Sequence, residues 1–378
     1  MFSPQTPQRS AVGFEIRFSC IVLTATSRKL SHMHSRVSNS LTLFLCISLL
    51  SCHDAEPVAP SSPFDLGVSG PGTFTVAPIN YPDFVYDTPL GSLNPPGHTV
   101  PTDHVYFYWV DPANRTPGDM DSLRTVYAPG SGIVDWMLPR TSTLADTKIE
   151  VKMTNTFRYY IDHLLLDSAI TIGTRIKAGQ RMGLTSPEAY AIDLGVTNDD
   201  VVLRGFIVPD RYGNSVHADS PYKYFVQPLR DSLYAKNTRI GPDKDGKIDY
   251  DIAGRLVGGW FLKGLPVGDS TMAPTGWTRH LAFVYDMNIP GAVRVSIGGV
   301  MSMTGVFALF QNTPDPAGIS IASGKVSLKL VSAFDRPTLI MGTFLVQLIA
   351  QDTIRTETFP NLNSDTLQFD SKASIYTR

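Results

Sequence analysis

Alternation of apolar and polar residues is the sequence feature that most limits the fold of this chain. Thr147-Lys-Ile-Glu-Val-Lys-Met153 alternates strictly, and Phe157–Ile161 continues the pattern after a short gap. A period of two places the apolar side chains on one face of a β-strand and the polar ones on the other. The same kind of run recurs towards the C-terminus in Leu281–Tyr285, Val293–Ile297, Val326–Val331 and Phe344–Ile349, and shorter candidates are Ile170–Ile172 and Val201–Leu203. The chain is therefore expected to be mostly β.

One helix is expected between Pro221 and Lys236. Phe225, Leu229 and Leu233 fall on one face at helical spacing, and such a face is expected to pack on the sheet. Because Pro228 is tolerated only in a first helical turn, the secure part of this helix follows it.

Length and charge limit the organisation and the partners. The chain has 378 residues, which suits about two domains at roughly 100–200 residues each. A formal net charge of −2 argues against nucleic acid as the main partner, since phosphate binding needs a concentrated basic face. Residues 76–255 combine strands with the one helix, whereas 256–378 show strands alone. The second region is expected to be a β-sandwich or a small barrel.

The N-terminal region resembles that of bacterial lipoproteins. Leu41–Leu50 is an apolar run too short to span a bilayer but typical of a signal peptide, and His34 and Arg36 precede it. Leu49-Leu50-Ser51-Cys52 follows and resembles a lipobox. The resemblance implies that the thiol of Cys52 accepts a lipid, which would anchor the protein to a membrane of the cell envelope.

The predicted signal sets the remaining N-terminal boundaries. Residues 1–51 are expected to be a leader and signal peptide, with Met33 as the true start. Residues 52–75, rich in Pro, Ser and Gly, are expected to be a lipidated tether. Cys20 and Cys46 would be removed with the leader, so the mature chain has no internal disulfide and its stability must come from core packing.

Five sequence blocks between residues 97 and 196 carry a second resemblance. They are Gly97–His104, Val126–Val134, Tyr160–Leu164, Gly173–Gly183 and Ala191–Val196. In that order they resemble the LytM-type, M23-family peptidases, which share the duplicated hybrid motif. The resemblance implies an antiparallel β domain over residues 76–255, a zinc ion, and peptidoglycan or a surface polymer as the partner.

The resemblance also implies roles for single residues. His98 corresponds to the first zinc ligand. The second ligand would be Asp103 or His104, although neither follows His98 at the family's spacing of three intervening residues. His163, in its Tyr-Ile-Asp-His-Leu block, corresponds to a catalytic histidine, and Asp193 would take the place of the last zinc ligand.

The closing strand departs from the family. Ala191-Ile192-Asp193 stands where the family has His-x-His. Residues 191 and 193 share a face of a strand, and a carboxylate can bind zinc. Ala191 has no group to move a proton, and loss of one general acid or base typically costs about 10²–10⁴-fold in rate.

Three functions therefore remain open. The leading expectation is an envelope lipoprotein that binds or acts on peptidoglycan or a surface polymer, with impaired catalysis. The first alternative is an active zinc metallopeptidase with a non-standard ligand set. The second is a non-catalytic scaffold that recruits an envelope partner through the C-terminal β domain.

Overall fold

The computed structural model describes residues 62–378, apart from 112–121, 141–143, 269–270, 273 and 335–337. The expected signal peptide, the start at Met33 and the lipid acceptor Cys52 lie outside the described residues. Among the residues that are described, no helix has the length and apolar character needed to cross a membrane.

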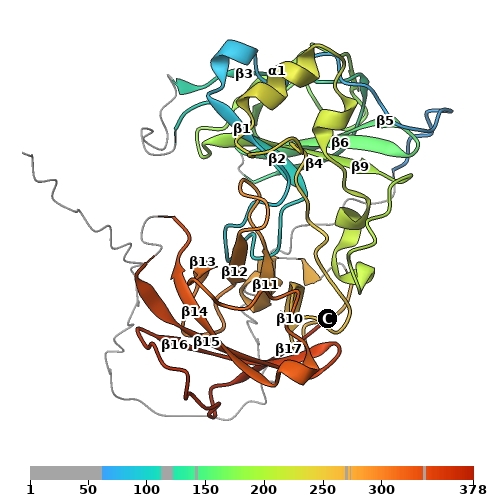
Figure 1. Ribbon diagram of the computed structural model, residues 1–378. Coiled ribbons are helices and arrows are strands. Elements are labelled where there is room, and N and C mark those ends of the chain that lie inside the picture. Colours follow the sequence, from blue (N-terminus) through green and yellow to red (C-terminus); the bar gives the residue numbers. More distant parts are fainter. Residues whose placement is uncertain (1–61, 112–121, 141–143, 269–270, 273, 335–337) are drawn as a thin grey trace, which may run out of the picture. The chain divides into compact units, whose positions relative to one another are not determined.

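Nine strands form one antiparallel sheet (Figure 1). Their order is β1-β2-β9-β6-β5-β4-β7, while β3 pairs with β8, which in turn pairs with β6. The strands are β1 (Tyr86–Thr88), β2 (His104–Tyr108), β3 (Thr125–Tyr127), β4 (Gly132–Pro139), β5 (Thr147–Thr154), β6 (Phe157–Leu166), β7 (Arg175–Ile176), β8 (Arg181–Thr185) and β9 (Ala191–Asn198).

The sheet has one apolar face and one polar face. Ile192 and Leu194 of β9 are fully buried in the core beside Phe107 of β2. The intervening positions point to the other face, because side chains alternate along a strand. There Tyr106 of β2 lies opposite Asp193 of β9. The polar face therefore brings together the residues for which the sequence predicts chemistry.

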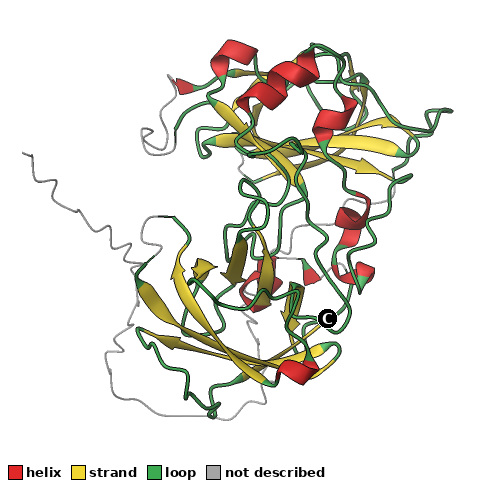
Figure 2. Ribbon diagram, in the orientation of Figure 1, coloured by secondary structure: helices red, strands yellow, loops and turns green. Residues whose placement is uncertain are grey.

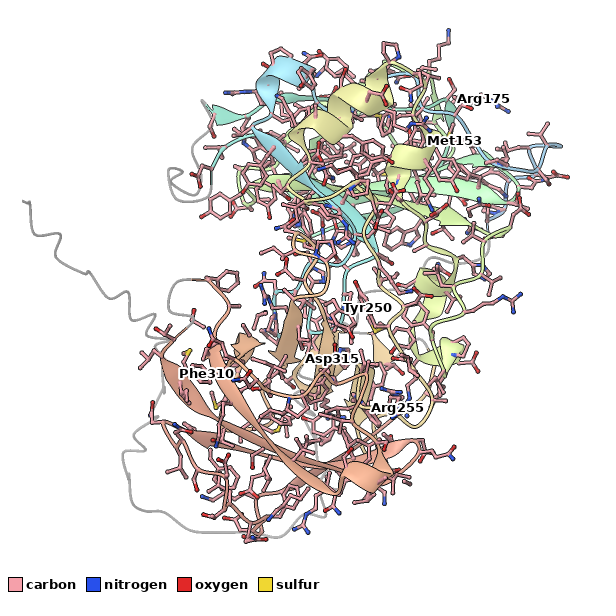
Figure 3. All side chains as sticks on the ribbon, viewed as in Figure 1. Met153, Arg175, Tyr250, Arg255, Phe310 and Asp315 are labelled. Carbon is pink, nitrogen blue, oxygen red and sulfur yellow. The ribbon has the colours of Figure 1, made fainter. Side chains whose placement is uncertain are left out.

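The residues just before the sheet pack against it. Phe74 is fully buried and contacts Tyr159 edge-on, with ring centroids 5.5 Å apart. Upstream, Lys152 of β5 donates to the hydroxyl of Ser62 at 3.0 Å. The neighbouring Met153 is labelled in Figure 3. From residue 62 onwards, the stretch expected to be a tether is thus bonded to β5.

Within the described ranges the helical segments are short, and one of them is an α-helix. Helix α1 (Leu229–Lys236) begins directly after Pro228, and Leu233 is fully buried in the core of the sheet. This confirms the predicted helix and its packing. The 3₁₀ turns are η1 (Tyr81–Asp83), η4 (Pro209–Arg211), η5 (Gly213–His217), η6 (Pro221–Tyr224), η8 (Pro274–Arg279) and η9 (Ile321–Ser323).

Eight further strands form a closed antiparallel barrel, in which β17 pairs with β10. Trp260, Phe344 and Tyr376 are fully buried in its core. The predicted fold class, mostly β with one short helix, is confirmed, and the C-terminal region is a barrel rather than a sandwich (Figure 2). The strands are β10 (Gly258–Leu262), β11 (His280–Tyr285), β12 (Val293–Ile297), β13 (Gly305–Leu309), β14 (Lys325–Ser332), β15 (Ile340–Ala350), β16 (Thr353–Pro360) and β17 (Ser374–Thr377).

Two short strand predictions were wrong. Ile170–Ile172 and Val201–Leu203 form no strand, and each segment follows a turn, closed by the bond from Ile170 N to Asp167 O or from Val201 N to Asn198 O. Their middle and end side chains point to solvent: Ile172 is 54% exposed and Val202 is 55% exposed. A run of three β-branched or aliphatic residues is too short to outweigh the turns that enclose it.

Candidate functional site

His104 is the centre of a polar cluster on the sheet. It opens β2 and is buried. Its Nδ1 lies 2.9 Å from the hydroxyl of Tyr160 and 3.1 Å from Oδ1 of Asp103. Its Nε2 lies 2.8 Å from the hydroxyl of Tyr106 and 3.2 Å from Oδ2 of Asp193. Both ring nitrogens therefore already have protein partners.

Asp103 closes the cluster on the Nδ1 side of His104. Its Oδ1 accepts a hydrogen bond from Tyr160 at 2.7 Å, and its Oδ2 accepts one from the hydroxyl of Ser215 at 2.6 Å. Burial alone would raise the pKa of Asp103, but the hydrogen bond and charge of His104 and the hydrogen bond from Ser215 hold it well below its usual range. Asp103 lies just before the first residue of β2, so the alternation of the strand does not direct its side chain to the opposite face. Its side chain and that of His104 therefore reach the same cluster.

Asp193 lies at the middle of the polar face. It is buried on β9, opposite Tyr106 on one side and Asp162 on the other. Its Oδ2 is 3.7 Å from Nε2 of His163. Its Oδ1 has no hydrogen-bond partner among the described residues. Burial raises the pKa of Asp193, as expected of a carboxyl group held away from water.

His163 occupies an irregular position in β6. This strand pairs with β9 through Asp162 and with β8 from Leu164, so His163 lies where the strand changes partner. Its φ is +63°, in the left-handed region that non-glycine residues rarely adopt. Its backbone N–H donates to Oδ1 of Asp162 at 2.7 Å, which stabilises this backbone conformation. Irregularities of this kind re-aim a side chain and are common beside functional sites.

The side chain of His163 is charged and partly exposed. Its Nδ1 lies 2.9 Å from Oδ1 of Asp146, and the side chain is 32% exposed. Burial alone would lower the pKa of His163, but the charge of Asp193 and the hydrogen bond to Asp146 raise it to about 9. His163 is thus an imidazolium at neutral pH, a proton donor rather than a base.

One group of three side chains brings metal-ligand atoms together, but it does not fit a zinc ion. Ligand atoms of Asp146, Asp162 and His163 lie within 4.8 Å of one another, and the described residues contain no other such group. Arg140 donates to both oxygens of Asp162, at 2.5 and 2.8 Å. The guanidinium of Arg140 therefore already neutralises Asp162, and Nδ1 of His163 is hydrogen-bonded to Asp146.

The ligand set that the resemblance implies also does not assemble. His104 and Asp193 meet, whereas the ring of His98 lies edge-on to that of His104 with centroids 5.3 Å apart. Burial and the charge of His104 lower the pKa of His98 to about 3, so it is neutral. These side chains do not bring three ligand atoms within 4.8 Å, and Tyr106 already holds Nε2 of His104.

The position at the family's ligand spacing is aromatic. Three intervening residues after His104 lead to Tyr108, which stacks on Tyr86 of β1 with ring centroids 4.6 Å apart. A phenol in a stacked pair is a poor replacement for a zinc-binding carboxylate. The residues present therefore do not fit a three-ligand zinc centre.

Several residues of the cluster were missed by the sequence analysis. Tyr106 shares a strand face with His104, so the alternation in β2 contained a signal for it. Tyr160 opens one of the five sequence blocks but was given no role there, whereas Ser215, Asp146 and Arg140 come from other parts of the chain and carry no local signal. Only the pairing of strands and the position of η5 bring them to the site.

Solved structures align with parts of this chain. Csd3 of Helicobacter pylori is 15% identical over 43% of this chain and 40% of its own length, with a TM-score of 0.28. The M23 metalloprotease pseudoalterin, from the deep sea, is 14% identical over 42% of this chain and 90% of its own, with a TM-score of 0.24. Lysostaphin is 11% identical over 81% of this chain and 92% of its own, with a TM-score of 0.26.

These likenesses are distant. The chain spans about two fifths of the length of Csd3, and no protein-family model and no curated protein matches it. At such scores the similarity carries no assignment of activity.

Proposed function

We propose that this chain is an envelope lipoprotein whose polar sheet face binds peptidoglycan or a surface polymer without zinc-dependent hydrolysis. The lipid anchor at Cys52 and the polymer partner come from the sequence resemblances. The geometry around His104 supports the loss of hydrolysis, and the exposed groups at the edge of the cluster support binding.

The observation that carries the proposal is that both ring nitrogens of His104 already have partners within the protein. Hydrolysis of an amide by zinc needs a metal with an open position and a group that moves protons. Nδ1 of His104 contacts Tyr160 and Asp103, and its Nε2 contacts Tyr106 and Asp193. A metal centre would require ligand atoms that are free to bind the ion. In this cluster the ring nitrogens of His104 are instead held by hydrogen bonds.

The rim of the cluster offers groups that suit a polar polymer. His163 presents a partly exposed imidazolium, and its Nε2 at 3.7 Å from Asp193 is too distant for a hydrogen bond. The side chains of Asp103 and Arg140 are each 27% exposed. A donor, an acceptor and a guanidinium around a rigid sheet can recognise amide and carboxylate groups of a peptide.

One observation supports the alternative of an active zinc peptidase. Oδ1 of Asp193 is buried without a partner, and its Oδ2 is 3.2 Å from Nε2 of His104. That separation is compatible with two ligands of one zinc ion. The alternative requires a further ligand to join them and Tyr106 to give up its bond to His104.

Co-sedimentation with purified sacculi tests the proposal. We expect the wild-type chain to pellet with sacculi equally well with and without a chelator. His163→Gln should weaken binding about tenfold, the effect of losing one charge-assisted hydrogen bond. Lys263→Gln, which removes a positive charge from an exposed residue of the barrel, is the matched control and should bind like wild type.

Two results would contradict polymer binding through this face. One is the absence of pelleting by the wild-type chain above the level of an unrelated protein of similar charge. The other is equal binding by the wild type and His163→Gln. Binding that disappears with chelator would instead support the zinc alternative.

A further inference from the structure

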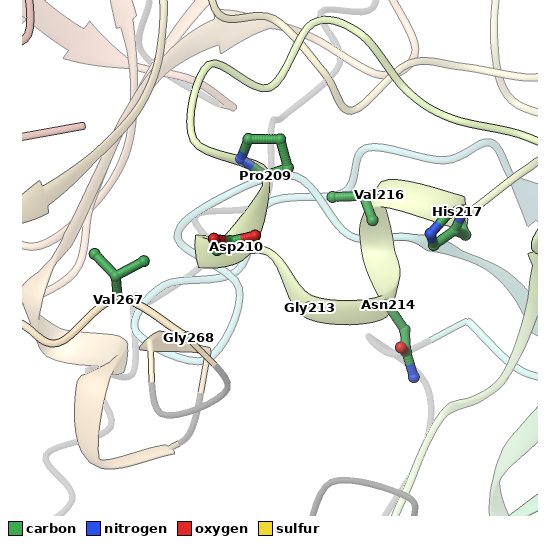
Figure 4. Close-up of a pocket in the computed structure, with 8 residues that line it drawn as sticks. All are labelled: Pro209, Asp210, Gly213, Asn214, Val216, His217, Val267 and Gly268. Atoms are coloured by element: carbon green, nitrogen blue, oxygen red, sulfur yellow. The ribbon is translucent and has the colours of Figure 1, made fainter. Parts of the chain in front are cut away.

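A cavity lies beside the η5 turn (Figure 4). Its volume is about 450 Å³, within the roughly 300–1,000 Å³ of small-molecule pockets. It is lined by Pro209, Asp210, Gly213, Asn214, Val216, His217, Val267 and Gly268. None of these residues belongs to the polar cluster around His104.

The polar groups of this cavity are mainly acceptors. Nδ1 of His217 lies 2.7 Å from the carbonyl oxygen of Val201. Because a carbonyl only accepts, Nδ1 donates to it, and the tautomer with its proton on Nδ1 leaves Nε2 as an acceptor. The carboxylate of Asp210 and the amide oxygen of Asn214 add further acceptors, and both side chains are exposed.

The negative charge of Asp210 is not neutralised within the described protein. Asp210 forms no ion pair with any described residue. The cation next to it in sequence, Arg211, lies over the ring of Phe261 at 5.0 Å and donates to the carbonyl oxygen of Leu265. Arg211 is thereby directed to other partners, and the cavity keeps an uncompensated carboxylate.

Apolar side chains complete the lining. Val216 comes from η5, and Val267 comes from the loop after β10. Methyl groups of this kind contact a hydrocarbon chain, while the carboxylate and the imidazole nitrogen accept hydrogen bonds. A primary ammonium has three N–H donors and one positive charge, which matches this set of acceptors.

We propose that this cavity binds a primary ammonium group carried on an aliphatic chain, such as the side chain of a basic residue in a peptide. Asp210 pairs with the ammonium, His217 and Asn214 accept its other hydrogens, and the two valines contact the methylenes. The proposal is independent of polymer binding at the His104 cluster.

The η5 turn connects this cavity to the polar cluster. Ser215, in the middle of the turn, donates to Asp103 at 2.6 Å, while Asn214, Val216 and His217 line the cavity. An occupant that shifts the turn would therefore alter the hydrogen bond to Asp103. This gives the cavity a direct structural route to the other site.

Binding of a matched pair of probes tests the proposal. Nα-acetyl-lysine amide is titrated into the full chain, and Nα-acetyl-norleucine amide, which lacks only the ammonium, serves as its control. We expect the lysine probe to bind with a Kd on the order of 1 mM and the norleucine probe at least about tenfold more weakly. The lysine probe should also shift the imidazole ¹⁵N signals of His217, assigned from a His217→Gln variant.

Asp210→Asn should weaken the lysine probe about tenfold, and its thermal unfolding should match wild type because residue 210 is exposed. Asp200→Asn removes another exposed carboxylate, outside the cavity, and should leave the Kd unchanged. Equal affinity for the two probes, no shift of the His217 signals, or wild-type affinity of Asp210→Asn would each overturn the proposal. Sedimentation with sacculi is a separate measurement, so failure here leaves the His104 site unaffected.

Discussion

His104→Ala is expected to lower the free energy of unfolding by about 3–5 kcal/mol, which is the usual cost of breaking a buried charged or hydrogen-bonded pair. The side chain of His104 is 8% exposed and contacts Asp193, whose side chain is 6% exposed. Removing the ring takes the 3.2 Å contact from that buried carboxyl and one hydrogen bond from the hydroxyl of Tyr106. Urea unfolding monitored by circular dichroism measures the change.

Tyr106→Phe shows how much stability is lost when one hydrogen bond of the network is removed and His104 stays in place. It removes one hydroxyl next to His104 and should cost about 1 kcal/mol. Lys263→Ala, an exposed substitution in the barrel, should stay within about 0.5 kcal/mol of wild type. If His104→Ala were no less stable than Tyr106→Phe, His104 would not hold the cluster together, and its nitrogens would be available to a ligand.

The ion pair between Arg140 and Asp162 is expected to give the second large effect. Asp162→Ala should cost about 3 kcal/mol, because it takes two hydrogen bonds from the guanidinium of Arg140 and removes the acceptor for the backbone N–H of His163. The pair forms two hydrogen bonds, at 2.5 and 2.8 Å, but the side chain of Arg140 is 27% exposed. Solvent screening therefore limits the coupling to about 1.5–3 kcal/mol.

A double-mutant cycle with Arg140→Ala measures this coupling directly. The single substitution of Arg140 should also destabilise, since Asp162 would be left buried beside Asp146. A coupling near zero would show that the two side chains act independently. In that case Asp162 would be free to take part in a cation site with Asp146 and His163.

The alternation of the sequence was sufficient to predict the fold class. β5 and β6 begin at the positions that the pattern indicated, and Ile149 and Val151 face the core as a period of two requires. The choice between sandwich and barrel could not be made from local pattern. It depends on the pairing of Phe261 with Thr377, two residues at opposite ends of the C-terminal region.

The candidate site was predicted only in part for a similar reason. The blocks that resemble M23 peptidases indicated His104, His163 and Asp193, which the structure brings to one face of the sheet. They could not indicate that Tyr160 would reach His104, because that contact depends on strand register. Ser215 comes from a 3₁₀ turn with no apolar periodicity, so no pattern predicts its contact with Asp103.

Metal content is the measurement that tests the central claim most directly. The full chain is purified without chelator, dialysed against zinc and then against buffer, and analysed by plasma mass spectrometry beside Asp193→Ala. Because the ligands around His104 are already satisfied, we predict no stoichiometric zinc in either protein. About one zinc per chain in the wild type, lost in Asp193→Ala, would contradict this account and identify a working metal centre.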